Sequence, residues 1–151
     1  MASGDSSFRI QTKPIPYPAA SMNPPAVGSI GWLDITVPDA EVLRTFYSSV
    51  VGWSSMAVDM EGYNDHCMIP PGTDAPVAGI CHARGTNVGL PAQWLPYITV
   101  ADLRASLEAS KSLGGQLVGE VRDTPMGLFA VIRDPAGAHC ALFQAAAPSA
   151  S

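Results

Sequence analysis

Charged residues are scarce in this chain of 151 residues, at 14% of the sequence, and only eight of them are lysine or arginine. Nucleic-acid binding depends on clustered basic side chains, so eight scattered cations and a net charge of −5 argue against such a partner. No apolar run approaches the roughly 18 residues that a membrane-spanning helix needs. The amino terminus also lacks the basic start and apolar core of a secretory signal. We therefore expect neither a nucleic-acid nor a membrane partner.

Cysteine is also rare, with three residues in a chain that is 47% hydrophobic. A chain of this length buries about 68–70% of its unfolded surface on folding, enough for a single core without a disulfide framework. An odd number of cysteines in such a chain predicts reduced thiols and a cytoplasmic location.

Proline is concentrated near the start, where five prolines fall between residues 14 and 25. Residues 1–27 show neither strand nor helix periodicity, which predicts an extended or disordered leader. Met22 is a second possible start, so residues 1–21 are either native or derived from expression. We expect one domain over residues 28–145 and an unstructured tail over residues 146–151.

The domain contains an internal repeat with an offset of 63 residues, since ITVPD at residues 35–39 returns as ITVAD at residues 98–102. In both copies an alternating segment typical of a strand precedes apolar residues at helical spacing, and three shorter strand candidates follow. The repeat predicts an α+β fold with two tandem βαβββ units, residues 28–85 and 93–145, joined by a linker at 84–92. Curved mixed sheets would surround a cup, with the helices on the convex side.

The individual elements follow from the same patterns. Asp39 is predicted to cap a helix that ends at Gly52, and a second helix is predicted from Asp102 to Leu113. Strands are predicted at residues 30–37, 53–60, 64–70 and 76–83, and then at 94–100, 116–122, 127–133 and 138–144. The apolar residues expected to face the sheet are Val42, Leu43, Phe46, Tyr47, Val50 and Val51 on the first helix, and Leu103, Leu107 and Leu113 on the second.

Strand alternation also predicts which side chains face the cup. If the side chains of Leu33, Ile35 and Val37 face the first helix, the residues that alternate with them point to the concave side. The repeat extends this assignment to the second unit. A mostly apolar face with a few polar groups is typical of small-molecule sites, although the same residues could simply fill the core. No lysine or arginine falls on these positions, which argues against an anionic ligand group. The predicted ligand-binding residues are Trp32, Asp34, Thr36, Leu95, Tyr97, His139 and Phe143.

Two of these residues are candidates for catalysis. Asp34 and His139 could form an acid–base pair, because a carboxylate beside an imidazole raises the pKa of the ring and fixes its orientation. Asp34, Cys81 and His139 could instead hold a metal ion with water, since thiolate and imidazole are favoured zinc ligands. A hydrogen-bonded structural aspartate, a structural histidine and buried thiols are the simpler interpretation.

The pattern resembles the vicinal oxygen chelate superfamily, which includes glyoxalase I, bleomycin-resistance proteins, fosfomycin-resistance enzymes and extradiol dioxygenases. The resemblance covers about residues 28–144, and the stretch 127–144 is most similar to glyoxalase-like proteins of unassigned function. It rests on Val37-Pro38-Asp39 with Gly52-Trp53, on Val100-Ala101-Asp102 with Gly114-Gly115, and on Asp134-Pro135-Ala136-Gly137.

Enzymes of the superfamily hold a divalent metal with side chains on the first and last strand of each unit. The resemblance places these positions at Trp32, Leu95, Ala141 and near Gly79, none of which can bind a metal. We therefore expect no metal and no other cofactor. The superfamily also implies a homodimer.

The leading hypothesis is a glyoxalase-like protein that binds a small apolar or aromatic molecule in the cup without the metal. The alternatives are a metal-dependent lyase, isomerase or dioxygenase, an acid–base enzyme using Asp34 and His139, and a scaffold whose cup is filled core.

Overall fold

The computed structural model describes residues 24–147. Most of the predicted leader and the last four residues of the predicted tail lie outside these residues. The first unit comprises β1 (Ile30–Val37), α1 (Ala40–Val51), β2 (Ser54–Asp59), β3 (Asn64–Ile69) and β4 (Ala78–His82). After a short 3₁₀ helix, η1 (Gly85–Asn87), the second comprises β5 (Leu95–Thr99), α2 (Leu103–Ser112), β6 (Gln116–Thr124), β7 (Gly127–Arg133) and β8 (His139–Ala145).

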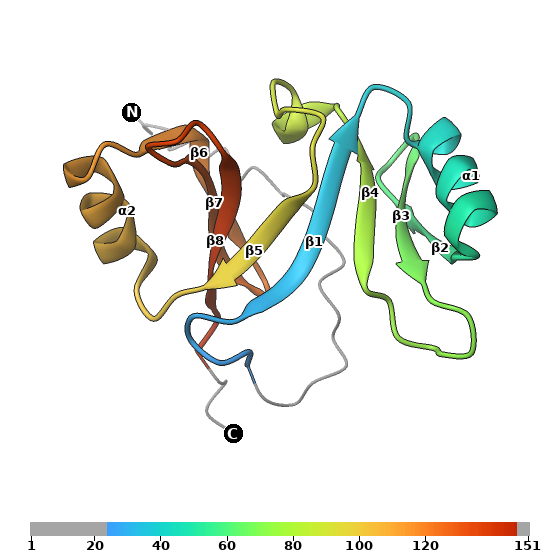
Figure 1. Cartoon of the computed structure of the whole chain (residues 1–151), viewed down its shortest axis with the longest axis horizontal. Helices are drawn as coiled ribbons and strands as arrows, with labels where there is room; N and C mark the ends of the chain where they lie inside the picture. The colour runs from blue at the N-terminus through green and yellow to red at the C-terminus, as the bar shows by residue number, and fades with distance from the viewer. Residues whose placement is uncertain (1–23, 148–151) are drawn as a thin grey trace, which may run out of the picture.

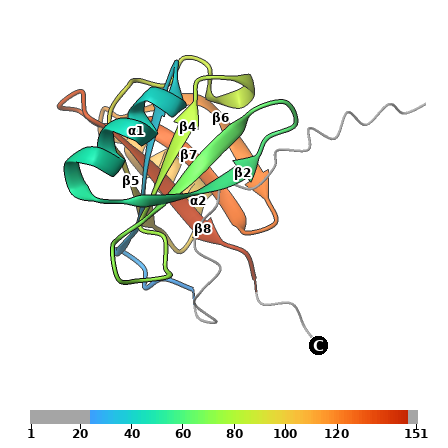
Figure 2. The ribbon, with the colours of Figure 1, turned by 90° about the vertical axis from the view of Figure 1, so that its right-hand side faces the viewer.

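The strands form one curved sheet in the order β2-β3-β4-β1-β5-β8-β7-β6, so each unit contributes four neighbouring strands (Figure 1). β1 and β5 join the units as an antiparallel pair, whereas β1–β4 and β5–β8 are parallel. The two helices lie at opposite ends on the outside of the sheet (Figure 1). In the turned view, strands of the first unit lie in front of those of the second (Figure 2). The predicted α+β fold with two βαβββ units is confirmed.

A pseudo-twofold axis relates the two units and passes through the central strand pair. Leu33 of β1 lies directly opposite Pro96 of β5, and these residues are separated by the same offset as the sequence repeat. Leu33 and Pro96 are therefore equivalent positions that face each other directly, and the pairs on either side of them are equivalent to one another. Trp32 is opposite Tyr97 and Asp34 is opposite Leu95 in the strand register.

The helix ends follow the predicted signals. The Asp39 carboxylate accepts hydrogen bonds from the backbone N–H groups of Glu41 and Val42, and Gly52 ends α1 with a left-handed φ of 77°. Asp102 caps α2 through the N–H of Ala105. A long-range contact adds to this cap, because Gln144 Oε1 accepts from the Leu103 N–H at 2.7 Å. The start of α2 is thereby fixed to β8.

The apolar residues of α1 do not form the single inward face that was predicted. Leu43 and Tyr47 pack against the core around Ile35, Met68 and Ile80. Only a narrow stripe of the helix contacts the sheet, because one or two residues in each turn are enough for this contact. The other four predicted residues are exposed: Val42, Phe46, Val50 and Val51.

The prediction for α2 was correct for two of three leucines. Leu103 is buried and Leu107 packs beside it against Ala130, Ile132 and Leu142. Leu113 is 77% exposed, because the helix has already ended at Ser112 and the chain turns away there. Neither α-helix within residues 24–147 is long and apolar enough to cross a membrane.

Candidate functional site

A buried carboxylate occupies the centre of the concave face. Trp32 Nε1 donates a hydrogen bond to Asp34 Oδ1 at 2.8 Å, and the Tyr97 hydroxyl donates to Asp34 Oδ2 at 3.0 Å. Asp34 is 3% exposed, so these two donors replace water. We call Trp32, Asp34 and Tyr97 the Asp34 cluster.

Desolvation dominates the electrostatics of this cluster. Burial raises the pKa of Asp34 from 3.8 to about 7, although the hydrogen bonds from Trp32 and Tyr97 and the charge of Arg122 act in the opposite direction. Burial also raises the pKa of the Tyr97 hydroxyl well above its ordinary value. At neutral pH the cluster therefore contains a carboxyl group that is close to its titration midpoint, next to a neutral phenol.

The room for this carboxylate comes from Gly79 on β4, which is paired with Asp34. A Cβ atom at Gly79 would lie 2.0 Å from Asp34 Oδ1 and 3.5 Å from Trp32 Cζ2. A side chain at position 79 would therefore clash with the Asp34 carboxylate, and glycine avoids this clash. Ala141, which pairs with Tyr97, is the equivalent small residue in the second unit.

The four positions that the resemblance assigns to metal ligands can be tested in this geometry. Trp32, Leu95 and Ala141 belong to one buried apolar cluster, and Gly79 borders it through the Trp32 ring. An indole, an aliphatic chain, a methyl group and a hydrogen atom supply no oxygen, sulfur or imidazole ligand. The residues present do not fit the metal centre of the superfamily.

The predicted ligand-binding residues share the concave face, and six of the seven are closed off from solvent. Trp32, Leu95, Tyr97 and Phe143 form one apolar cluster together with residues of β3, β7 and β8. Asp34 and Thr36 are buried beside it, and all six are 5% exposed or less. His139 is only partly buried. None of the seven lines the open pocket described below. Their role in ligand binding therefore stays a prediction.

Asp34 and His139 are not brought together as an acid–base pair. Leu95 of β5 lies between them in the sheet, so their backbones are two strands apart, roughly 10 Å. Both carboxylate oxygens of Asp34 accept from the Asp34 cluster, whereas His139 Nδ1 is buried without a hydrogen-bond partner among the described residues. Nor do Asp34, Cys81 and His139 form a metal site, since no group of three such side chains in residues 24–147 could hold an ion.

The cysteines also lack the environment of a nucleophile. Burial raises the pKa of the Cys67 thiol to about 12 and that of Cys81 well above its ordinary value, in both cases with the charge of Asp34 adding to the effect. All three cysteines are thiols, as predicted. A reactive cysteine needs a lowered pKa, and neither Cys67 nor Cys81 meets that condition.

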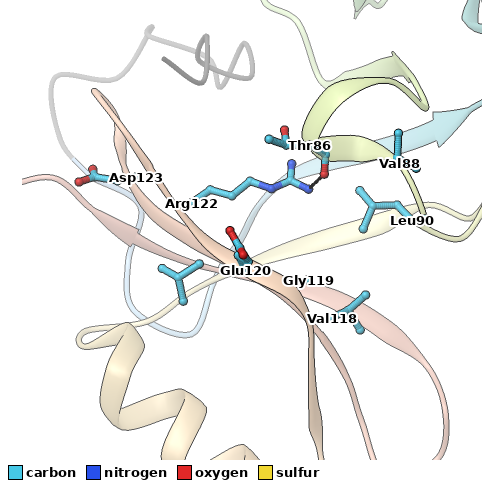
Figure 3. A pocket seen from close by; sticks show the side chains of 10 residues that line it. Thr86, Val88, Leu90, Val118, Gly119, Glu120, Arg122 and Asp123 are labelled. Atoms are coloured by element: carbon cyan, nitrogen blue, oxygen red, sulfur yellow. Dashed lines mark hydrogen bonds between the residues drawn. The ribbon is translucent and has the colours of Figure 1, made fainter. Parts of the chain in front are cut away.

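An open pocket of about 580 Å³ lies between the linker and β6 (Figure 3). Its volume is within the range of small-molecule sites. Leu90 of the linker and Val118 of β6 both line it and also pack against the apolar cluster that contains Trp32 and Tyr97. The base of the pocket is therefore the outer layer of the predicted cup. We call it the mouth pocket; it is lined by Thr86, Val88, Gly89, Leu90, Val118, Gly119, Glu120, Val121, Arg122 and Asp123.

Arg122 is the functional candidate that the sequence did not reveal. Its guanidinium lies 5.2 Å from the centre of the Phe129 ring, and that ring lies 5.9 Å from the ring of Tyr97. The positions predicted to face the cup carry no basic residue, but Arg122 on β6 lies outside those positions. Strand alternation predicts faces only where the register is regular, and β6 carries a register shift between Val118 and Arg122. The positive φ of Gly119, 76°, lies in that shift.

Comparison with known proteins places these features in a family. The model of the glyoxalase-like domain matches residues 32–143. Among curated proteins, the chain is 32% identical over 111 residues to the anthracycline biosynthesis protein DauV of Streptomyces sp. (strain C5), covering 74% of this chain and 39% of that protein. It is 29% identical over 128 residues to the putative glyoxylase CFP32 of Mycobacterium tuberculosis, covering 78% and 46%. The chain thus spans less than half the length of these relatives.

Solved structures show the same fold at low identity. One is a variant of methylmalonyl-CoA epimerase from Streptomyces coelicolor in complex with 2-nitronate-propionyl-CoA, with a TM-score of 0.51, 16% identity, and coverage of 81% of this chain and 100% of that one. Another is a hypothetical protein from Bacillus halodurans C-125, with a TM-score of 0.53, 11% identity, and coverage of 82% and 98%. These likenesses concern the fold alone. The family match over residues 32–143, which include most of both βαβββ units, shows that the chain belongs to the glyoxalase-like domain family.

Proposed function

We propose that this protein binds a small, largely apolar or aromatic molecule in the mouth pocket, above the Asp34 cluster. The observation that carries the proposal is the pocket itself: about 580 Å³ of open space whose apolar walls, Leu90 and Val118, continue into the buried aromatic cluster. Apolar walls with a few fixed polar groups are the usual composition of such sites.

A relative's name suggests the class of molecule. Two curated relatives are named as anthracycline biosynthesis proteins, at 32% and 31% identity. From that name we extend to this chain only a ligand class, a planar fused-ring aromatic. Flat rings would contact Leu90 and Val118, and such contacts depend on area rather than on direction.

We also propose that binding needs no metal and no other cofactor. The four positions of the superfamily's metal ligands carry Trp32, Gly79, Leu95 and Ala141, which offer no ligand atom. Elemental analysis of protein purified without chelators or metal columns tests this point. We expect far less than one equivalent of transition metal per chain. One tightly held equivalent, lost in His139→Ala, would contradict it and favour a metal-dependent lyase, isomerase or dioxygenase.

The binding proposal is tested by filling the pocket. Val88 and Val77 are both exposed valines, but only Val88 lines the mouth pocket. Val88→Trp should weaken binding of the neutral probe 2-(hydroxymethyl)anthraquinone, measured by fluorescence quenching, by about tenfold, which corresponds to about 1.4 kcal/mol. Val77→Trp is the matched control and should leave the affinity within about twofold. Failure of wild-type protein to bind the probe, or equal effects of both substitutions, would refute the proposal.

The expected setting is a homodimer in the cytoplasm. The exposed apolar side chains of α1, among them Val42, Phe46 and Val50, support pairing of chains, because contiguous exposed apolar surface is typical of interfaces. Sedimentation equilibrium of the full chain tests the dimer, and a monomer at micromolar concentration would contradict it.

A further inference from the structure

The side chain of Arg122 is held in a fixed position across the mouth pocket. It extends from β6 to η1, where Nη2 donates to the Thr86 carbonyl oxygen (Figure 3). There Nη1 also donates to Asn87 Oδ1 at 2.6 Å. Its guanidinium also lies over the Phe129 ring. Three contacts on two elements fix the plane of the guanidinium, so little side-chain entropy remains to be lost when a ligand binds.

In its direct contacts the charge of Arg122 has no counter-ion, although Asp34 acts on it at longer range. Both hydrogen-bond acceptors are neutral, and no ion pair among residues 24–147 involves this side chain. Burial is the main cause that lowers its pKa, which shows that water is partly excluded. A partly desolvated cation without a directly bonded anion is unfavourable. A guanidinium has five N–H donors, and the protein uses two of them here.

We propose that Arg122 recognises the anionic oxygen of the ligand, and that the mouth pocket therefore takes a planar aromatic acid with a single negative charge. This inference rests on the proposed function. A carboxylate or phenolate on a flat ring would accept from the remaining donors of Arg122 in the plane of the guanidinium. The ring would then lie against Leu90 and Val118, which form the apolar walls.

The same pocket argues against ligands with several negative charges. Glu120 and Asp123 are exposed carboxylates on its wall, and the whole chain has a net charge of −5. Repulsion from them grows with each charge on the ligand, whereas Arg122 supplies only one compensating charge. Phosphate esters and pyrophosphates are therefore disfavoured relative to a monocarboxylate.

A purely structural role for Arg122 makes a different prediction from ligand recognition. If Arg122 only joined η1 to β6, its loss would weaken all ligands alike. If it recognises the anion, its loss must abolish a preference between two ligands that differ only in charge. The two probes are anthraquinone-2-carboxylate and 2-(hydroxymethyl)anthraquinone, titrated into the full chain at pH 8.

Wild-type protein should bind the carboxylate about 10–100-fold more tightly than the alcohol, the range expected for charge-assisted hydrogen bonds. Arg122→Gln should reduce this ratio to about one, because it removes the charge and keeps an amide near Asn87. Arg84→Gln is the matched control: Arg84 stacks on Tyr63, does not line the mouth pocket, and its loss changes the net charge equally. It should leave the ratio unchanged.

Asn87→Asp is a second variant that keeps Arg122 in place. The new carboxylate would pair with the guanidinium and compete with an anionic ligand, so it should lower the affinity for the carboxylate probe and spare the alcohol. Equal affinities of wild-type protein for both probes would overturn the inference and leave the proposed function intact. An affinity ratio between the carboxylate and the alcohol that stays unchanged in both Arg122→Gln and Asn87→Asp would also overturn the inference and leave the proposed function intact. Binding of neither probe would overturn the proposed function and, with it, this inference.

Discussion

Asp34 should give this protein a pH dependence of stability opposite to that of most aspartates. The pKa of Asp34 is about 7 in the folded chain against an ordinary 3.8, which we take for the unfolded chain. Between these two values the folded chain holds a proton that the unfolded chain has released. The free energy of unfolding therefore falls as the pH rises through this window, and is unaffected by Asp34 above and below it.

The magnitude follows from the size of the shift. Each pKa unit corresponds to 1.36 kcal/mol, so a shift of about three units amounts to about 4 kcal/mol lost between pH 4 and pH 7. Asp34 is fully enclosed, so solvent does not screen this contribution. Other groups titrate in the same range, and for that reason the quantity to measure is the difference between wild-type protein and Asp34→Asn.

Asp34→Asn has nearly the shape of the protonated acid and can still accept from Trp32 Nε1. Its amide N–H can donate to the Tyr97 oxygen, as the protonated carboxyl would. We expect the variant to equal wild-type protein at pH 4 to within about 1 kcal/mol, and to exceed it by up to about 4 kcal/mol at pH 8. Urea unfolding at intervals of half a pH unit measures both curves.

Asp74→Asn is the matched control, because Asp74 is exposed and the change in charge is the same. Its curve should run parallel to that of wild-type protein. The reasoning is refuted if the difference between wild-type protein and Asp34→Asn stays constant with pH, or if wild-type protein becomes the more stable of the two as the pH rises.

Four further substitutions test the surroundings of Asp34 and the orientation of α1. Gly79→Ala places a Cβ 2.0 Å from Asp34 Oδ1 and should destabilise by about 3 kcal/mol, the upper range for overpacking; an unchanged urea midpoint would contradict the close packing. Tyr97→Phe removes a hydrogen bond to the charged form of Asp34, so the fall in stability should extend to higher pH; an unchanged window would show that the phenol does not stabilise the carboxylate. Leu43→Ala should cost at least about 2 kcal/mol, whereas Phe46→Ala on the exposed face should cost less than about 1 kcal/mol; similar losses would contradict the orientation of α1.

Much of the fold could be predicted because its signals are local. The β1 strand begins and ends at the predicted residues, and Asp39 and Gly52 cap the first helix as expected. Helix faces were harder to predict. Apolar residues cover more of the α1 surface than its contact with the sheet requires, so periodicity could not distinguish Leu43 from Val42.

The mouth pocket could not be predicted for a different reason. It is formed by the linker and β6, which are far apart in the sequence and meet because the sheet curves. No short-range sequence pattern predicts this contact. The bond from Arg122 to Asn87 connects residues 35 positions apart. A signal did exist in part, since Gly119 within a strand pattern indicates an irregularity, and irregular strands often lie next to functional sites.

The meeting of Asp34 and Tyr97 explains why the repeat is imperfect at the axis. These two residues hold equivalent positions, 63 residues apart, and their side chains touch across the pseudo-twofold axis. A perfect repeat would place identical groups there. Two aspartates would repel each other when ionised, and two tyrosines would crowd the space that Gly79 and Ala141 leave open. One acceptor and one donor satisfy both positions in the buried centre. The sequences of the two units therefore have to differ at the point where the units come closest.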